Sequence, residues 1–237
     1  MTLRLGLPSK GRLMEDAFAW FAARGIPLSR DGGERTYAAR AGWEGLEPVL
    51  LSAGEIPRDL ASGRLHLGVT GSDLVRERVA GWERRLEALA PMGFGAADVV
   101  IAVPDFWVDV RTLDDLDAAC AAFRQAHGRR LRIATKYHRL VRDFLRAHGV
   151  ADYLLVDSQG ATEGTVKAEA AEAVADITST GETLRANGLR VLDDGVIHRS
   201  EATLFRSRTA GWGRAERAAL DRLLERVGGQ TIPAAGG

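Results

Sequence analysis

Short apolar runs alternate with longer amphipathic stretches along most of this 237-residue chain. An apolar run of about four to eight residues has the length of a buried β-strand. Such runs predict strands over residues 3–7, 49–52, 65–70, 99–103, 131–134, 153–156, 174–177 and 202–205.

The intervening stretches place apolar residues three or four positions apart, which is the helical repeat. In residues 137–147, for example, Leu140, Val141, Phe144 and Leu145 fall on one face. Alternating strands and helices favour an α/β fold with mostly parallel sheets. The helices are expected over residues 13–23, 113–123, 137–147 and 214–227.

Two interruptions of this pattern indicate domain boundaries. One falls within residues 91–98, where the sequence reads Pro-Met-Gly-Phe-Gly, and the other near residues 189–195. We therefore expect domain I to span residues 1–95 and to be completed by residues 190–237, with domain II formed by residues 96–189. The Gly- and Ala-rich tail, residues 228–237, is expected to be disordered.

Composition narrows the class of protein. Lys plus Arg equals Asp plus Glu, at 32 each, which argues against a general binder of nucleic acid or membrane surfaces. Cys120 is the single cysteine, so neither an intramolecular disulfide nor a cysteine-based zinc site is expected. No apolar run reaches membrane-spanning length, and the start lacks a signal-peptide pattern, so a cytoplasmic protein is expected.

The turn after the predicted strand 174–177 carries the strongest chemical signal. It reads Asp-Ile-Thr-Ser-Thr-Gly-Glu-Thr over residues 176–183. Backbone N–H groups at the start of a following helix, together with several hydroxyls, make an anion site. Gly181 would allow close approach of a ligand, and Asp176 could accept hydrogen bonds from sugar hydroxyls. This chemistry suits a 5-phosphoribosyl group; the alternative is a simple capping turn.

Other turns follow predicted strands, where parallel sheets place their ligand sites. Residues 8–12 put Lys10 and Arg12 on either side of a glycine, which favours phosphate binding, although a solvated turn fits as well. The spacing does not match a Walker A loop, which argues against a P-loop ATPase or kinase. Arg58 opens a short helix after Pro57 and either faces a cleft or is solvated.

The remaining candidates do not indicate covalent or metal chemistry. The turn that contains Gly71 and Asp73 fits either a ligand contact or a strand-to-helix turn. The five histidines lack metal-ligand spacing, and His138 is expected at the surface or in the core rather than on a ligand. No Ser-His-Asp arrangement or nucleophile elbow is present.

Taken in order, five segments resemble ATP phosphoribosyltransferase, the first enzyme of histidine biosynthesis. They are LPSKGRL at 7–13, LGVTGSDLV at 67–75, RIATKY at 132–137, DITSTGETLRANGL at 176–189 and VIHRSEATL, read as one strand, at 196–204. The segment 176–189 is the most specific of these.

The resemblance implies a fold and a reaction. The fold is an α/β fold of two domains, like that of periplasmic binding proteins, with a ligand cleft between the lobes. In the reaction, N1 of the ATP adenine attacks C1 of phosphoribosyl pyrophosphate (PRPP) and displaces pyrophosphate. Mg²⁺ is expected to bind mainly through the pyrophosphate of PRPP, and the resemblance names no protein side chain as its ligand.

Residue roles follow from position within the resemblance. Lys10, Arg58 and, by alignment, Arg35 are expected to be catalytic residues that face the triphosphate or pyrophosphate together with Arg12. Asp176 and Glu163 are expected to bind the ribose hydroxyls. The 5-phosphate is assigned to Thr178, Ser179, Thr180, Gly181, Glu182 and Thr183, and the substrate-binding set is completed by Gly71, Asp73 and Lys136.

The chain departs from the family pattern in two places. Ser9 is an extra residue within the commoner LPKGR motif, and residues 165–166 and 169–172 replace the family's usual segments before the phosphate turn. The family's C-terminal regulatory domain has no counterpart in this sequence. It therefore resembles the short form, which implies a homo-oligomer within a hetero-oligomer with a subunit related to histidyl-tRNA synthetase.

Two other functions remain open from the residues alone. A non-enzymatic ligand-binding protein of the same two-lobed fold would usually carry a signal peptide. A phosphoribosyltransferase for a free base would typically have two adjacent acidic residues before its phosphate turn, whereas Asp176 stands alone here.

Overall fold

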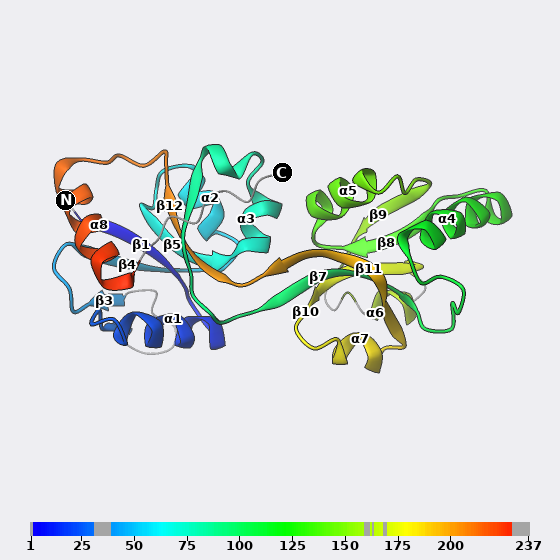
Figure 1. Ribbon diagram of the computed structural model, residues 1–237, viewed down its shortest axis with the longest axis horizontal. Coiled ribbons are helices and arrows are strands. Elements are labelled where there is room, and N and C mark those ends of the chain that lie inside the picture. The colour runs from blue at the N-terminus through cyan, green and yellow to red at the C-terminus, as the bar shows by residue number, and fades with distance from the viewer. Residues whose placement is uncertain (1, 31–38, 159–161, 163, 168–169, 229–237) are drawn as a thin grey trace. The chain divides into compact units, whose positions relative to one another are not determined.

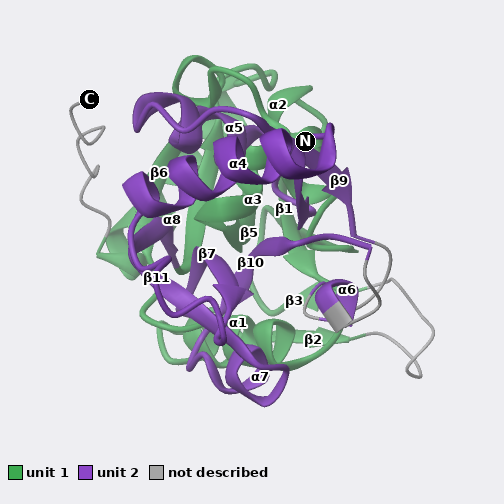
Figure 2. Cartoon of the chain, turned by 90° about the vertical axis from the view of Figure 1, so that its right-hand side faces the viewer, with its two compact units in different colours: residues 1–95, 201–237 green, residues 96–200 purple. Residues whose placement is uncertain are grey.

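The computed structural model describes residues 2–30, 39–158, 162, 164–167 and 170–228. The chain forms two compact units, residues 1–95 with 201–237 and residues 96–200 (Figure 2). The return to the first unit therefore comes later than residue 190, which corrects the expected boundary. The reason is that residues 189–200 form one long strand that pairs within the second unit.

The first unit contains a five-stranded sheet, a two-stranded sheet and the helices that cover them (Figure 1). Its elements are β1 (Leu3–Pro8), α1 (Arg12–Ala22), β2 (Leu28–Arg30), β3 (Ala39–Ala41), β4 (Leu46–Leu51), α2 (Ile56–Ala61), β5 (Leu67–Gly71), α3 (Ser72–Arg78), the 3-10 helix η1 (Trp82–Arg84), β6 (Leu86–Pro91), β12 (Ala202–Ser207) and α8 (Arg214–Val227).

The second unit contains another five-stranded sheet, with α4 and α5 on one side and α7 on the other (Figure 1). Its elements are β7 (Ala97–Pro104), α4 (Leu113–His127), β8 (Leu131–Thr135), α5 (His138–Ala147), β9 (Tyr153–Asp157), α6 (Gly164–Lys167), β10 (Ala173–Thr178), α7 (Glu182–Ala186) and β11 (Leu189–Ser200).

Both five-stranded sheets are mixed. The strand orders are β4-β1-β5-β12-β6 and β11-β7-β10-β8-β9. Within the described residues, each sheet has two parallel and two antiparallel pairs. The expectation of mostly parallel sheets was therefore wrong. In these two sheets, every antiparallel pair of described strands involves β7 or β12, and each of these is the first strand formed after the chain passes from one unit to the other.

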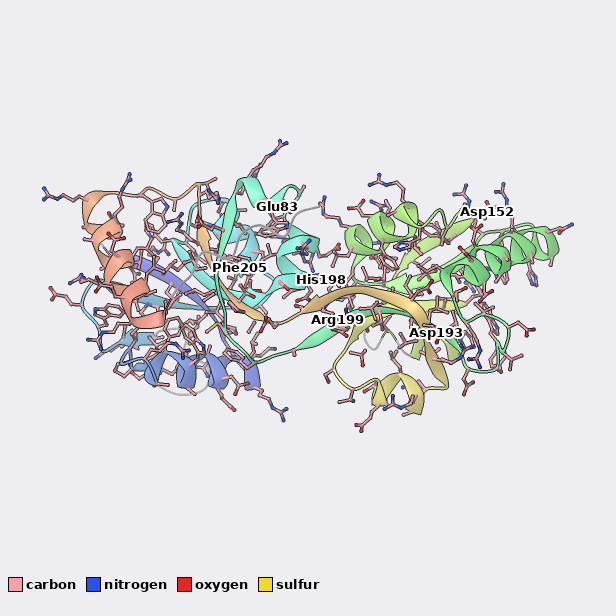
Figure 3. All side chains as sticks on the ribbon, viewed as in Figure 1. Glu83, Asp152, Asp193, His198, Arg199 and Phe205 are labelled. Atoms are coloured by element: carbon pink, nitrogen blue, oxygen red, sulfur yellow. The ribbon has the colours of Figure 1, made fainter. Side chains whose placement is uncertain are left out.

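Each predicted strand overlaps an observed strand, and each predicted helix overlaps an observed helix. The prediction of a single strand over residues 196–204 was wrong, because this segment is divided between β11 and β12 at Glu201. Figure 3 shows His198 and Arg199 on β11 and Phe205 on β12. The tail, apart from Gly228, lies outside the described residues.

Alternation along β1 places its side chains in two cores. Leu3, Leu5 and Leu7 pack under α1 and α8 with Phe21. On the other face, Gly6 leaves room for the side chains that pack beside α2, since an added Cβ would lie 2.5 Å from Cδ1 of Leu65. The sheet of the first unit is therefore buried on both faces, as an α/β layer arrangement requires.

Cys120 lies on the buried face of α4, as the sequence predicts. Burial raises the pKa of its thiol to about 12, and the nearby carboxylates of Asp117 and Asp152 act in the same direction. A thiol with so high a pKa is a packing residue rather than a nucleophile. In the part of the chain that the structure describes, every helix is too short or too polar to cross a bilayer.

Candidate active site

Three loops of the first unit meet at one edge of its sheet. β1 lies between β4 and β5 and runs parallel to both, so the carboxyl ends of these three strands are neighbours. The backbone N–H of Ser9 donates to the carbonyl of Leu51 at 2.8 Å. The hydroxyl of Thr70 donates to the carbonyl of Ala53 at 3.2 Å. The loops that follow β1, β4 and β5 are thus tied together.

These loops carry the predicted cations. Lys10 and Arg12 lie at the end of β1 and the start of α1, and both are exposed. Arg58 is exposed in the first turns of α2, where Pro57 occupies an early helical position. The structure therefore brings Lys10, Arg12 and Arg58 to the same edge, where they can attract a polyphosphate. Arg35 lies outside the described residues.

Gly71 and Asp73 occupy the third loop but differ in exposure. Gly71 is the N-cap of α3, in an extended conformation, and is partly exposed. Asp73 is in the first turn of α3 and is only 4% exposed. Its contact with a substrate stays a prediction.

A carboxylate that sequence reasoning missed shapes the loop before Arg58. Glu55 accepts hydrogen bonds through Oε2 from the Ser52 hydroxyl at 2.7 Å and from the Ser52 backbone at 3.0 Å. These bonds, with a smaller contribution from Arg58, lower the pKa of Glu55. The Ser-x-x-Glu spacing of a capping box was the available signal.

Arg30 is a second residue that the sequence did not single out. It is the last residue of β2, and its guanidinium donates to the carbonyl oxygen of Ser9 at 3.0 Å. This contact reaches the loop that carries Lys10.

In the second unit, the parallel strands β8, β9 and β10 also end side by side. Thr135 pairs with Ala175 on one side and with Asp157 on the other. Lys136 follows β8 and is exposed. At the start of α5, Nε2 of His138 lies 2.6 Å from Oδ1 of Asp157. His138 thus lies at the surface, bonded to the end of the neighbouring strand.

The predicted phosphate turn joins β10 to α7. The hydroxyl oxygen of Thr178 accepts from the Gly181 N–H at 2.8 Å, and that of Thr180 accepts from the Glu182 N–H at 3.3 Å. Gly181 has φ 73° and ψ 0°, in the left-handed region that favours glycine. The turn is therefore held by its own hydroxyls, as a capping turn is, while those hydroxyls keep their protons for donation to a ligand.

Other groups of this turn face outward. Ser179, Thr180, Glu182 and Thr183 are exposed. Among the described residues, the backbone N–H groups of Ser179 and Thr180 and the side chain of Ser179 have no hydrogen-bond partner. Unpaired donors at one turn are what an anionic oxygen requires.

Asp176 lies within β10, two residues before its end, and is partly exposed. Its Oδ1 accepts the N–H of Ile177 at 2.8 Å, which leaves the second oxygen for a hydroxyl donor. The strand runs further than predicted because it pairs with β7 as far as Thr178. Glu163 lies outside the described residues.

The site residues thus form two groups, one at the strand ends of each unit. One group supplies exposed cations and the other supplies neutral donors around a glycine turn. Within its own unit, the first group offers contacts for phosphate groups, and the second offers contacts for a phosphate and for sugar hydroxyls.

Comparison with solved structures supports the two-lobed α/β fold. The ATP phosphoribosyl transferase (HisG:HisZ) complex from Thermotoga maritima includes a chain with a TM-score of 0.71 at 21% identity, covering 96% of this chain and 97% of that one. The substrate-binding protein of an amino acid ABC transporter gives a TM-score of 0.53 at 11% identity, covering 96% and 92%. The fold is therefore of the periplasmic-binding-protein type.

Sequence comparisons are more specific. A family model described as HisG: ATP phosphoribosyltransferase matches residues 52–229. An ATP phosphoribosyltransferase from Cereibacter sphaeroides is 67% identical over 216 residues, which cover 91% of this chain and 92% of that protein. Another, from Rhodopseudomonas palustris strain BisB18, is 51% identical over 228 residues, covering 94% and 70%. On these matches, the chain belongs to the ATP phosphoribosyltransferase family.

Proposed function

We propose that this chain transfers the 5-phosphoribosyl group of PRPP to N1 of the adenine of ATP, the first step of histidine biosynthesis. A bond forms between N1 and C1 of the ribose as the bond from C1 to the pyrophosphate oxygen breaks. The products are N1-(5-phosphoribosyl)-ATP and pyrophosphate. The observation that carries the proposal is the donor-rich turn between β10 and α7, in a chain of this family.

In the proposed complex, the turn after β10 holds the 5-phosphate. The N–H groups of Ser179 and Thr180 and the surrounding hydroxyls donate to phosphate oxygens, while Asp176 accepts from the ribose hydroxyls. In this arrangement the 5-phosphate is bound by uncharged N–H and O–H donors and not by a cationic side chain. Glu163 is the proposed second ligand of the ribose hydroxyls.

Lys10, Arg12, Arg35 and Arg58 are proposed to face the polyphosphates. Negative charge accumulates on pyrophosphate as it leaves, so fixed cations stabilise the transition state more than the ground state. Adenine N1 is a weak nucleophile, and its attack depends on the positioning of both reactants. This scheme requires no nucleophile from the protein.

Mg²⁺ is proposed to enter with the pyrophosphate of PRPP, whose oxygens are hard ligands that suit this ion. Within the described residues, no group of three or more His, Cys, Asp or Glu side chains is arranged to hold a metal ion. When bound, Mg²⁺ would neutralise part of the pyrophosphate charge, and the cations at the ends of β1 and β4 would hold the remainder.

A partner subunit is also proposed. The Thermotoga maritima neighbour was solved as a HisG:HisZ complex. By analogy, this chain would work as a homo-oligomer within a hetero-oligomer, with a regulatory subunit related to histidyl-tRNA synthetase.

The experiment is a pyrophosphate-release assay with PRPP, Mg²⁺ and one acceptor at a time, in the presence of the partner subunit. ATP should support release, whereas adenine and orotate should not. Turnover of a free base with ATP inert would establish the competing phosphoribosyltransferase function. Binding of both substrates without any release would favour a ligand-binding protein.

A further inference from the structure

We propose that Arg30 is a positioning residue for Lys10, acting through the backbone of Ser9. The inference rests on the proposed function, because it concerns how one of the proposed polyphosphate contacts is aimed. It adds a residue that no motif of the sequence includes.

Arg30 and Ser9 are far apart in sequence but bonded in the fold. Arg30 ends β2, and its terminal nitrogen donates to the Ser9 carbonyl oxygen at 3.0 Å. On its other side, the Ser9 N–H donates to the carbonyl of Leu51, at the end of β4, at 2.8 Å. Ser9 is 8% exposed. Its backbone is therefore held from two different elements.

The bonded carbonyl belongs to the peptide unit that joins Ser9 to Lys10. A peptide unit is planar, and in the trans form its C=O and N–H point in opposite directions. The structure contains no cis peptide bond among its described residues. Fixing the Ser9 oxygen toward Arg30 therefore aims the N–H of Lys10 away from Arg30, and it fixes the Cα from which the exposed Lys10 side chain extends.

The residues on either side of Lys10 make this anchor necessary. Lys10 follows the last residues of β1 and precedes Gly11, whose φ of 73° lies in the left-handed region. A glycine in the loop that follows a strand gives the chain more freedom than any other residue would. A guanidinium suits the task, since it stays protonated and presents its donors in a rigid plane.

Arg30 also brings a cation near Lys10, so a loss of activity on its removal has two explanations. It could act on the substrate directly through its charge, or through Lys10 by position. A double-mutant cycle between Arg30→Met and Lys10→Met separates them, because only residues that act together give non-additive effects.

The test measures kcat and KM for ATP and PRPP in the full complex with the partner subunit. Arg30→Met should lower kcat/KM by about 10- to 100-fold, the range expected for loss of a hydrogen bond from a charged group. In the Lys10→Met background the same change should cost no more than about 3-fold. Arg30→Lys, which keeps a charged donor, should recover part of the loss.

Arg40→Met is the matched control. Arg40 lies on β3, opposite Ser29 of β2, and is exposed, so the control removes an arginine from the same two-stranded sheet. It should retain parental kinetics. Circular dichroism and thermal unfolding of every variant identify a folding defect, in which case Arg30→Lys, rather than Arg30→Met, enters the cycle.

The outcomes are distinct. A large effect of Arg30→Met that shrinks in the Lys10→Met background supports positioning. Equal effects in both backgrounds, or no effect of Arg30→Met in an active enzyme, would overturn it. If the parent protein does not make phosphoribosyl-ATP at all, the proposed function itself fails.

Discussion

At Gly181, the effect of a substitution on PRPP binding can be separated from its effect on stability. Its φ of 73° is nearly the same as the 69° of Gly188, which follows α7. Either residue changed to alanine should lose about 1–2 kcal/mol of stability, because a left-handed conformation is unfavourable for residues with a Cβ. At Gly181 the new Cβ would also lie 2.9 Å from a terminal nitrogen of Arg185, beside the proposed phosphate.

We therefore expect Gly181→Ala to weaken PRPP binding by about 10-fold or more. The substitution would displace the N–H donors of the turn from the phosphate, and the loss of one hydrogen bond to a charged group has about this effect. Gly188→Ala should match it in thermal unfolding but bind PRPP normally. Titration calorimetry with PRPP and Mg²⁺ gives both affinities. Equal affinities for the two variants would place the 5-phosphate elsewhere.

Arg58 tests the other half of the proposed site. It is exposed, and Glu55 beside it is already bonded to Ser52, so no buried ion pair is lost when Arg58 is removed. Arg58→Ala should lower kcat by about 100-fold with a smaller change in substrate affinity, as expected for a group that stabilises departing charge. Steady-state kinetics decide the matter, and a normal kcat would leave Arg58 as a solvated surface residue.

At the scale of elements, Glu172 joins the starts of β8 and β10. It accepts from the Arg132 guanidinium at 2.7 Å, from the Arg132 N–H at 2.7 Å and from Arg129 at 3.1 Å. Burial opposes its ionisation, yet the hydrogen bonds from Arg132 and Arg129 outweigh burial and lower the pKa to about 2. The ionised carboxylate is thus part of what holds these two strands together.

Glu172→Gln should therefore lower the free energy of unfolding by on the order of 2 kcal/mol at neutral pH. A depressed pKa stabilises the folded state above the unfolded pKa and loses that effect as pH falls toward the folded pKa. The difference between parent and variant should thus shrink between the ordinary value of 4.5 and about 2.

Urea unfolding across this pH range, with circular dichroism as the signal, gives the measurement. Glu83→Gln is the control, since it makes the same chemical change at an exposed residue of η1 (Figure 3). A pH-independent difference for Glu172→Gln would show that the carboxylate does not carry its charge into the folded state as described.

Elements also show which parts of the fold the sequence predicts. Strong alternation, as in β1, and helical spacing, as in α5, predict their elements because one face of each is buried. β2 and β3 have three residues each, too few to show a period. β6 is rich in alanine, and it precedes the interruption that predicts a boundary.

The first half of β11, before residue 196, was missed for a different reason. Its pairing with β7 shifts register between Val191 and His198, and the bulge contains two acidic residues. Asp194 accepts the N–H of Leu113 at 2.9 Å, at the start of α4, and the N–H of Asp193 donates to the carbonyl of Arg111 at 2.8 Å. Figure 3 shows Asp193 on this strand. Two acidic residues in succession are typical of a loop, so the sequence alone did not predict a strand there.

At the scale of the whole molecule, the strand-end positions of the candidate residues were more predictable than the sheet directions. The candidate residues were expected after strands, and in each unit neighbouring parallel strands do end side by side; the roles of these residues stay predictions. Sheet direction was not predictable from local pattern, since it depends on where the chain crosses between units and re-enters as β7 and β12. Arg30 was not predictable either, because its bond to Ser9 depends on the tertiary fold.

Regulation belongs to this scale as well. If a partner subunit binds histidine, it controls catalysis only by favouring one conformational state of this chain over another. The isolated chain should then turn over, at full or reduced rate, without inhibition by histidine, and the partner subunit should create inhibition. Pyrophosphate release across a histidine titration, with and without the partner, measures this. Strong inhibition of the isolated chain would place the sensor within these 237 residues.

The most direct test of the proposed reaction follows the new bond itself. ATP labelled with ¹⁵N at N1 and PRPP labelled with ¹³C at C1 are incubated with Mg²⁺ and the full complex, and the product is examined by NMR. Transfer of the ribosyl group to N1 predicts a one-bond coupling between the two labels, with one pyrophosphate released per product. Pyrophosphate release that yields ribose 5-phosphate without this coupling, or a ribosyl group attached to another atom, would contradict it.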